Sequence, residues 1–119
     1  MGRVHMANTM KRERDKLTAT IVEGLEIKTD MGRAIVSVAL DCIKLFDDEQ
    51  QDYGSDNVSA SGGIGIAVRL QDKVARMRHL LLKALRGDDK VNNEPLADTY
   101  QGVANYGLIG MLLNKGKWK

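Results

Sequence analysis

Hydrophobic and polar positions follow helical spacing in two long segments of the chain. Over 66–85 the apolar residues recur every three or four positions and form one stripe: Leu70, Val74, Met77, Leu81 and Leu85. Over 31–51 the middle of the segment is apolar on nearly every side. The pattern predicts a helix in each segment. We expect the 31–51 helix to be central, either contacted on several sides or facing another subunit.

Local residues mark where the 31–51 helix begins and ends. Thr29 or Asp30 can accept hydrogen bonds from its first N–H groups, and Gly54 can terminate it. Residues 53–64 are rich in glycine and serine, so we expect a loop there. Loops of this length in a compact domain often serve a functional site.

A third helix is predicted over 95–114. Gly87 closes the preceding helix, Asn93 can cap the new one, and Pro95 suits its first turn. Each glycine inside this helix costs about 1 kcal/mol relative to alanine, so a close approach of another helix or of a ligand is expected. These glycines are Gly102, Gly107 and Gly110.

The N-terminal segment, residues 1–28, gives a mixed pattern. We interpret residues 1–6 as a cloning remnant, and the charged residues of 7–17 as a solvated segment or a frayed turn. From Leu17 to Ile27 the apolar positions alternate, which favours a strand or a hairpin, although helical spacing also fits. The predicted fold is therefore mainly α. Three main helices over 29–119 form a small bundle completed by oligomerisation, with a short N-terminal strand or hairpin.

Composition limits the classes of function. The 18 basic and 16 acidic side chains of this 119-residue chain nearly cancel, so we expect no binding of polymeric nucleic acid. No apolar run approaches the roughly 20 residues that span a bilayer, and no signal peptide is evident, so we expect a soluble, cytoplasmic protein. The only cysteine, Cys42, cannot form an internal disulfide and is interpreted as a small buried residue without chemistry.

A basic face on the 66–85 helix is the first candidate site. Four basic residues lie along one side of the helix and bracket Asp72: Arg69, Lys73, Arg76 and Lys83. Arginine offers a flat fork of donors and lysine a point charge, a combination that holds phosphates. The alternative is a solvated face with a weak ion pair between Asp72 and Arg76.

Acidic side chains at two helix ends form the second candidate. Glu94 and Asp98 lie one turn apart, and two such carboxylates can share Mg²⁺ when substrate phosphates complete its shell. The alternative is that they stabilise the helix dipole. A second acidic cluster, which includes Glu49 and Asp52, ends the 31–51 helix, where acids are unfavourable. Motifs of P-loop enzymes, zinc sites and serine hydrolases are lacking.

The order of these motifs carries a resemblance. Asp52-Tyr53-Gly54 with Asn57 is followed by Arg69-x-x-Asp72-Lys73-x-x-Arg76, then by Asn93-Glu94, Asp98-Thr99 and Ala104-Asn105-Tyr106. Over 34–113 the chain resembles the phage nucleotide modification associated domain type 1, a branch of the MazG-like all-α nucleotide pyrophosphohydrolases. The resemblance implies an oligomer that cleaves a nucleoside triphosphate to monophosphate and pyrophosphate with Mg²⁺ or Mn²⁺, in the cytoplasm of a phage-infected bacterium.

The resemblance also implies residue roles. Glu94 and Asp98 would hold the metal, with Asp52 as a further catalytic acid near the metal or the substrate. Asp72 is not among these acids; it is a candidate metal ligand in place of the family acid that the chain lacks at position 102. The phosphates would meet Arg69, Lys73 and Arg76. The nucleotide pocket would be shaped by Tyr53, Asn57, Asn105 and Tyr106.

One position departs from the family pattern. Where relatives have a second acid after Asp98, this chain has Gly102. The loss of one carboxylate weakens metal binding and leaves three hypotheses open. The protein is a nucleotide pyrophosphohydrolase, or an inactive nucleotide-binding protein that sequesters a defence signal, or a helical oligomerisation module.

Overall fold

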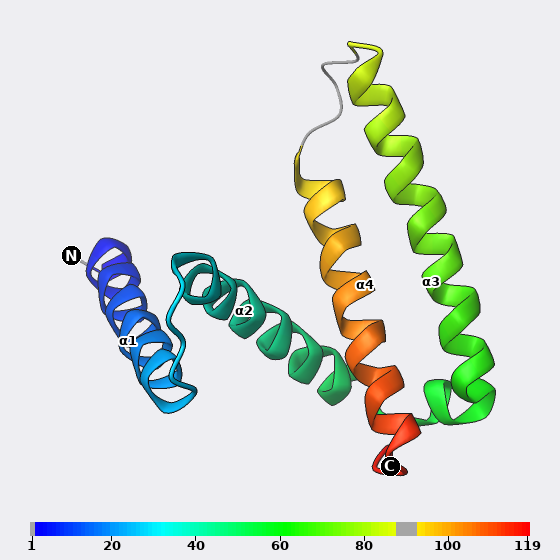
Figure 1. Cartoon of the computed structure of the whole chain (residues 1–119), viewed down its shortest axis with the longest axis horizontal. Coiled ribbons are helices and arrows are strands. Elements are labelled where there is room, and N and C mark those ends of the chain that lie inside the picture. Colours follow the sequence, from blue (N-terminus) through cyan, green and yellow to red (C-terminus); the bar gives the residue numbers. More distant parts are fainter. Residues whose placement is uncertain (1, 88–92) are drawn as a thin grey trace. The chain divides into compact units, whose positions relative to one another are not determined.

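The computed structural model describes residues 2–87 and 93–119, with side chains from Pro95 onward in the second range. These residues form four helices and no strand (Figure 1). The helices are α1 (Gly2–Gly24), α2 (Asp30–Tyr53), α3 (Asp56–Leu85) and α4 (Asn93–Asn114). The mainly α fold class is confirmed, with one helix more than predicted.

The strand or hairpin predicted in the N-terminal segment is wrong, because the structure forms a continuous helix, α1, from Gly2 to Gly24. Its threonines fit the helix by donating to the carbonyl four residues earlier, as Thr18 does to Arg14 and Thr20 to Lys16. No side chain of α1 is buried. The alternating pattern therefore did not reflect a half-buried strand.

The chain divides into two compact units, unit 1 (Met1–Lys44) and unit 2 (Leu45–Lys119). The boundary falls inside α2. The boundary proposed from sequence, between residues 28 and 29, instead coincides with the turn that joins α1 to α2.

Unit 1 is organised around this turn. Glu26 has a positive φ of 55°, and the Ile27 N–H donates to the Val22 carbonyl at 2.9 Å, which satisfies the end of α1. Thr29 Oγ1 then accepts from the Gly32 N–H at 2.9 Å, which confirms the predicted threonine cap of α2.

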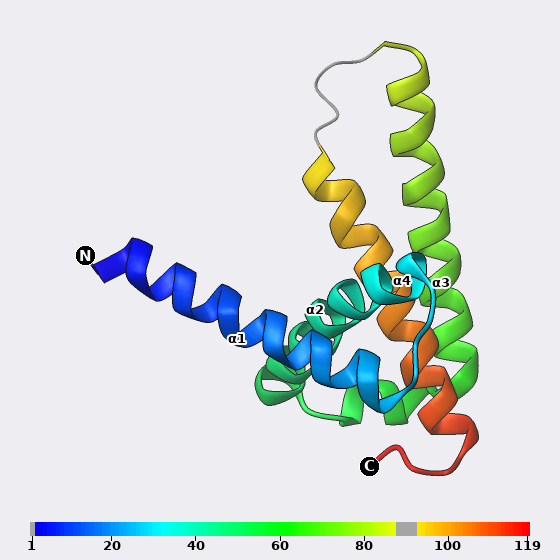
Figure 2. The same ribbon diagram turned by 60° about the vertical axis from the view of Figure 1, so that its left-hand side comes forward.

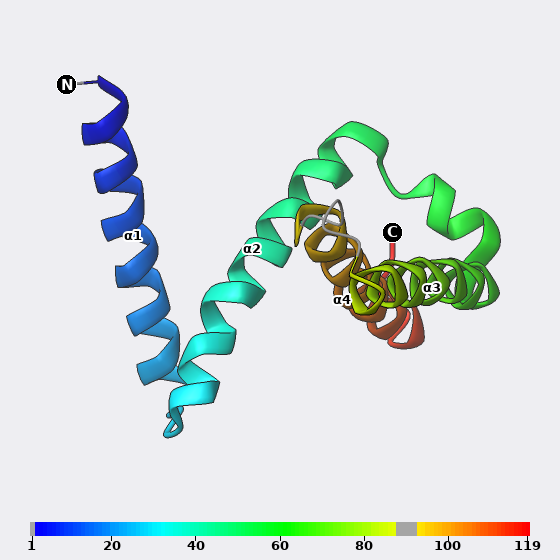
Figure 3. The same ribbon diagram turned by 90° about the horizontal axis from the view of Figure 1, so that it is seen from above.

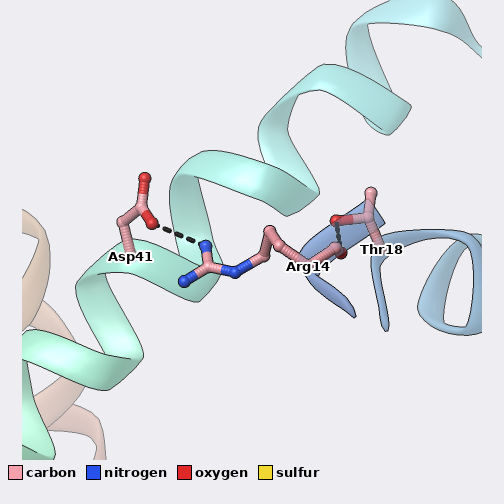
Figure 4. Close-up of polar contacts among 3 residues, drawn as sticks. All are labelled: Arg14, Thr18 and Asp41. Carbon is pink, nitrogen blue, oxygen red and sulfur yellow. Dashed lines mark hydrogen bonds and ion pairs between the residues drawn. The ribbon is translucent and has the colours of Figure 1, made fainter. Parts of the chain in front are cut away.

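Few contacts besides the turn hold α1 and α2. An ion pair joins Arg14 of α1 to Asp41 of α2 (Figure 4). Val36 and Cys42 are the buried apolar residues of this unit. The prediction that α2 is contacted on several sides is wrong for Ile35, Val38 and Ile43, which are all more than half exposed.

Unit 2 is built on an antiparallel pair, α3 and α4, which lie side by side in all three views (Figures 1, 2 and 3). Its core consists of Val58, Ile66 and Ile109. The partly buried residues that pack against this core are Phe46, Leu70, Tyr106, Leu113 and Trp118. None of the helices in the described part of the chain is long and apolar enough to cross a membrane.

The loop predicted over 53–64 is wrong in extent, because helix resumes at Asp56. Gly54 has a φ of 68° and ends α2 as predicted. Residues 56–64 of the predicted loop form the first part of α3, and this helix places Val58 in the core. A kink at Gly62, with φ 59° and ψ −149°, then redirects the helix.

Candidate functional site

A pocket of about 560 Å³ lies within unit 2. Its walls come from the last turns of α2, the first turn and middle of α3, one face of α4, and Trp118. The volume lies in the usual range for small-molecule sites, and the lining combines apolar side chains with charged and amide groups. Such a lining is typical of binding sites in which apolar side chains contact the ligand and a few polar groups fix its orientation.

The apolar part of the pocket includes Trp118, which follows α4. After α4 the chain turns at Gly116, with φ 68°, and the Lys117 N–H donates to the Leu112 carbonyl at 2.9 Å. The Trp118 ring then packs edge-on against Phe46 with centroids 6.1 Å apart, and its Nε1–H donates to the Ser55 carbonyl at 3.2 Å. These contacts fix the tryptophan as a wall of the pocket.

Two cations and one aromatic ring form the most distinctive part of the pocket. Arg69 Cζ lies 5.8 Å from the centroid of the Tyr106 ring, and Lys73 Nζ lies 5.6 Å from it. The cations are one turn apart on α3, and the tyrosine comes from α4. Both cationic side chains are half-buried. The ring's negative face therefore holds two positive charges at the pocket wall.

Neither of these cations forms an ion pair with a carboxylate of the described residues. In unit 1, by contrast, ion pairs join Arg14 to Asp41, Lys16 to Glu13, and Arg33 to Asp30. Like charges one helical turn apart repel by a few tenths of a kcal/mol. An anion beside Arg69 and Lys73 would relieve this repulsion.

Gly102 lies directly against Lys73. A Cβ at position 102 would be 2.6 Å from Lys73 Cε and 2.8 Å from Nζ. The glycine therefore gives the lysine room to reach Tyr106. A carboxylate side chain at position 102 would therefore meet this lysine.

The acidic residues named from sequence divide between the pocket and other surfaces. Asp98 lines the pocket, together with Glu49 from the acidic end of α2. Asp52 and Asp72 do not line it. The side chain of Glu94 lies outside the described residues. Within the described part of the chain, no group of three or more His, Cys, Asp or Glu side chains is placed to hold a metal ion.

The remaining predicted residues mostly lie together. Tyr53, Asn57 and Asn105 line the pocket along with the cations and Tyr106, whereas Arg76 is exposed and does not line it. Sequence reasoning did not assign Gln50, Gln101, Phe46 or Trp118 to this site, and it named Glu49 only as part of the acidic end of the 31–51 helix. The spacing of Gln101 from Asp98 and Asn105, at three and four residues, was the available signal for one of them.

Comparisons of this chain with protein-family models, with curated proteins and with solved structures found no match.

Proposed function

We propose that unit 2 binds a nucleotide in the pocket beside Tyr106. The observation that carries the proposal is the pair Arg69 and Lys73, held at the pocket wall without a carboxylate partner among the described residues. Guanidinium and ammonium groups recognise phosphates in complementary ways, one as a planar fork and one as a point charge. Phosphate groups would lie against these two cations.

The rest of the pocket suits the sugar and the base. Apolar surface from Phe46, Ile109 and Trp118 can contact a flat ring, and the amide side chains of Asn57 and Gln101 offer donors and acceptors for its edges. The order of sequence motifs that resembles the phage nucleotide modification associated domain supports the same ligand class.

A titration with nucleotides tests this proposal. Trp118 is the only tryptophan of the chain and lines the pocket, so its fluorescence should change on binding, and calorimetry can confirm the affinity. We expect Lys73→Met to weaken nucleotide binding by about tenfold or more, because a charge-assisted phosphate contact contributes about 1.5–3 kcal/mol. Methionine keeps the length of the side chain and removes its charge.

The matched control is Lys83→Met, the same change on an exposed turn of α3 outside the pocket. It should leave the affinity unchanged. The ligand panel should include nucleoside triphosphates, cyclic nucleotides, pyrophosphate and an unphosphorylated nucleoside. Equal affinity for the wild type and Lys73→Met would overturn the phosphate assignment, and absence of binding across the panel would favour the oligomerisation module.

Hydrolysis of the bound nucleotide is a second candidate, favoured by Asp98 and Glu49 in the same pocket. Two carboxylates fit a magnesium ion that arrives with the ligand, since Mg²⁺ keeps waters and shares substrate phosphates. Such an ion would neutralise phosphate charge and activate water. Asp98 and Glu49 would hold it, while Arg69 and Lys73 orient the phosphates. The setting would be the nucleotide pool of a phage-infected bacterial cytoplasm.

A pyrophosphate-release assay with Mg²⁺ or Mn²⁺ tests this second candidate. If the pocket is catalytic, Asp98→Asn should reduce turnover by at least about 100-fold while retaining nucleotide affinity within a few-fold. Asp72→Asn, an acid on α3 that does not line the pocket, serves as the control and should retain activity. If the wild-type protein binds nucleotide tightly but does not turn it over, hydrolysis is rejected and the protein is a nucleotide-binding protein that sequesters its ligand.

A further inference from the structure

Helix α4 packs against α3 on one side and has an apolar face on the opposite side that α3 does not cover. The side toward α3 carries Ile109, which packs in the core with Ile66, and Tyr106, which lies against Arg69 and Lys73. The opposite face is exposed and bears no charge: Ala97, Tyr100, Ala104, Gly107, Leu108 and Met111. From Thr99 to Asn114 the helix contains no charged residue at all. A contiguous apolar face on the surface of a helix usually marks a contact with a partner.

Gly107 is an independent sign that the exposed face has a partner. A glycine inside a helix costs about 1 kcal/mol relative to alanine, so its retention usually reflects close packing. Gly102 accommodates Lys73, and a Cβ at Gly110 would lie 3.8 Å from Ile66 Cγ2. A Cβ at Gly107, by contrast, would meet nothing within 4 Å. No described atom of unit 2 therefore occupies the space beside this glycine.

The spacing of the exposed face fits a helix-to-helix contact. Positions 97, 100, 104, 107 and 111 alternate by three and four residues, as along the seam of paired helices. Small residues, Ala104 and Gly107, lie at its centre, and the larger Tyr100 and Met111 lie one turn outside them. Two helices can therefore approach closely at the centre and pack larger side chains on either side.

We propose that this face binds the same face of a second copy of the chain, with the two α4 helices antiparallel. A two-fold axis between residues 105 and 106 would place Tyr100 opposite Met111 and Ala104 opposite Gly107 in both halves of the contact. The distribution of charge along α4 favours a second copy of the chain as the partner. Acids alone occur in the first turns of α4, at Glu94 and Asp98, whereas the segment after its last turn contains only basic charges, Lys115, Lys117 and Lys119.

An antiparallel pair brings each acidic end beside the basic end of the other copy, and it also opposes the helix dipoles. A parallel pair would place like ends together. A contact confined to one helix face is smaller than the roughly 800 Å² per partner of a standard interface, so we expect a dissociation constant in the micromolar range. This dimer does not depend on the proposed nucleotide site.

Sedimentation of the full chain over a concentration series tests the proposal. The wild type should be dimeric at high concentration, and Ala104→Arg should raise the dimer dissociation constant by at least about 100-fold, because it buries a charge without a partner. Ala75→Arg, on an exposed position of α3, is the matched control and should dimerise as the wild type does.

Exchanged charges test the orientation. Tyr100→Glu and Met111→Lys should each weaken the dimer, whereas the double variant should recover at least about tenfold of the lost affinity, since each glutamate then faces a lysine of the other copy. The two positions are 11 residues apart in α4, about 16 Å, so they cannot compensate within one chain. In a parallel pair each glutamate would face a glutamate and each lysine a lysine, so the double variant would not recover the lost affinity.

Three results would overturn the proposal. One is a wild type that stays monomeric to about 1 mM, where even a millimolar contact would be detected. Another is a dimer that Ala104→Arg leaves intact, which would place the interface elsewhere. The third is a monomer that Ala104→Arg unfolds, which would show that residues of the same chain cover this face. Circular dichroism of each variant distinguishes unfolding from dissociation.

Discussion

Unit 1 and unit 2 are built from helices of similar length, but they are stabilised in different ways. Unit 2 packs Val58, Ile66 and Ile109 into one core. Unit 1 buries Val36 and Cys42, and its first helix buries no side chain. Local contacts account for much of unit 1, namely its threonine cap, its turn hydrogen bonds and two ion pairs between residues three apart in the chain. Unit 2 depends on tertiary packing.

The difference explains where a binding site can form. A ligand site needs side chains that are held in place by packing, because a mobile side chain loses entropy when it orders around a ligand. Arg69 and Lys73 are fixed against Tyr106, and Trp118 is fixed against Phe46, all close to the unit 2 core. The open groove between α1 and α2 in unit 1, about 530 Å³, has no comparable support.

The largest effect that would test this contrast is expected from Ile109→Ala. Ile109 is buried in the unit 2 core beneath the pocket. Removing its side chain should lower the stability of unit 2 by about 2–5 kcal/mol, the usual cost of a large-to-alanine core change. Urea unfolding followed by Trp118 fluorescence measures this loss directly, because the tryptophan lies in unit 2.

The matched control is Ile64→Ala, the same substitution on an exposed turn of α3. It should change the unfolding free energy of unit 2 by no more than about 0.5 kcal/mol. Similar losses for both isoleucines would mean that burial does not distinguish them. The assignment of the core, and with it the contrast between the units, would then be wrong.

Helix positions were largely predictable because they follow from local chemistry. The helix predicted over 31–51 is observed as α2 over Asp30–Tyr53, and the helix predicted over 95–114 is observed as α4 over Asn93–Asn114. Thr29, Gly54 and Gly87 act at helix ends as their residue types predict. The loop over 53–64 failed for a tertiary reason. Glycine and serine favour loops locally, but burial of Val58 stabilises helix there, and Gly62 absorbs the change of direction.

The candidate site was predictable where its residues share helix faces. Arg69 and Lys73 came from spacing on one helix, and Asn105 and Tyr106 came from the motif resemblance; all four line one pocket. Trp118 could not be placed from sequence, because its position depends on the turn at Gly116 and on Phe46, more than 70 residues earlier. Helical periodicity also could not show that Arg76 lies beyond the pocket.

The smallest expected effect concerns the turn of unit 1, where Glu26 adopts a positive φ of 55°. Non-glycine residues are strained in this conformation, and glycine removes the strain. Glycine also has more conformational freedom in the unfolded chain, which lowers stability. Because the relief of strain is larger, Glu26→Gly should stabilise the turn by about 0.5–1 kcal/mol. Hydrogen exchange of the Ile27 amide, which donates to the Val22 carbonyl, measures the local change as a few-fold slower exchange. Glu23→Gly, inside the last turn of α1, should instead speed exchange, since glycine is unfavourable in a helix. If both glycines weakened protection, the Glu26 side chain would contribute a stabilising contact larger than its strain, and unit 1 would depend on more than local structure.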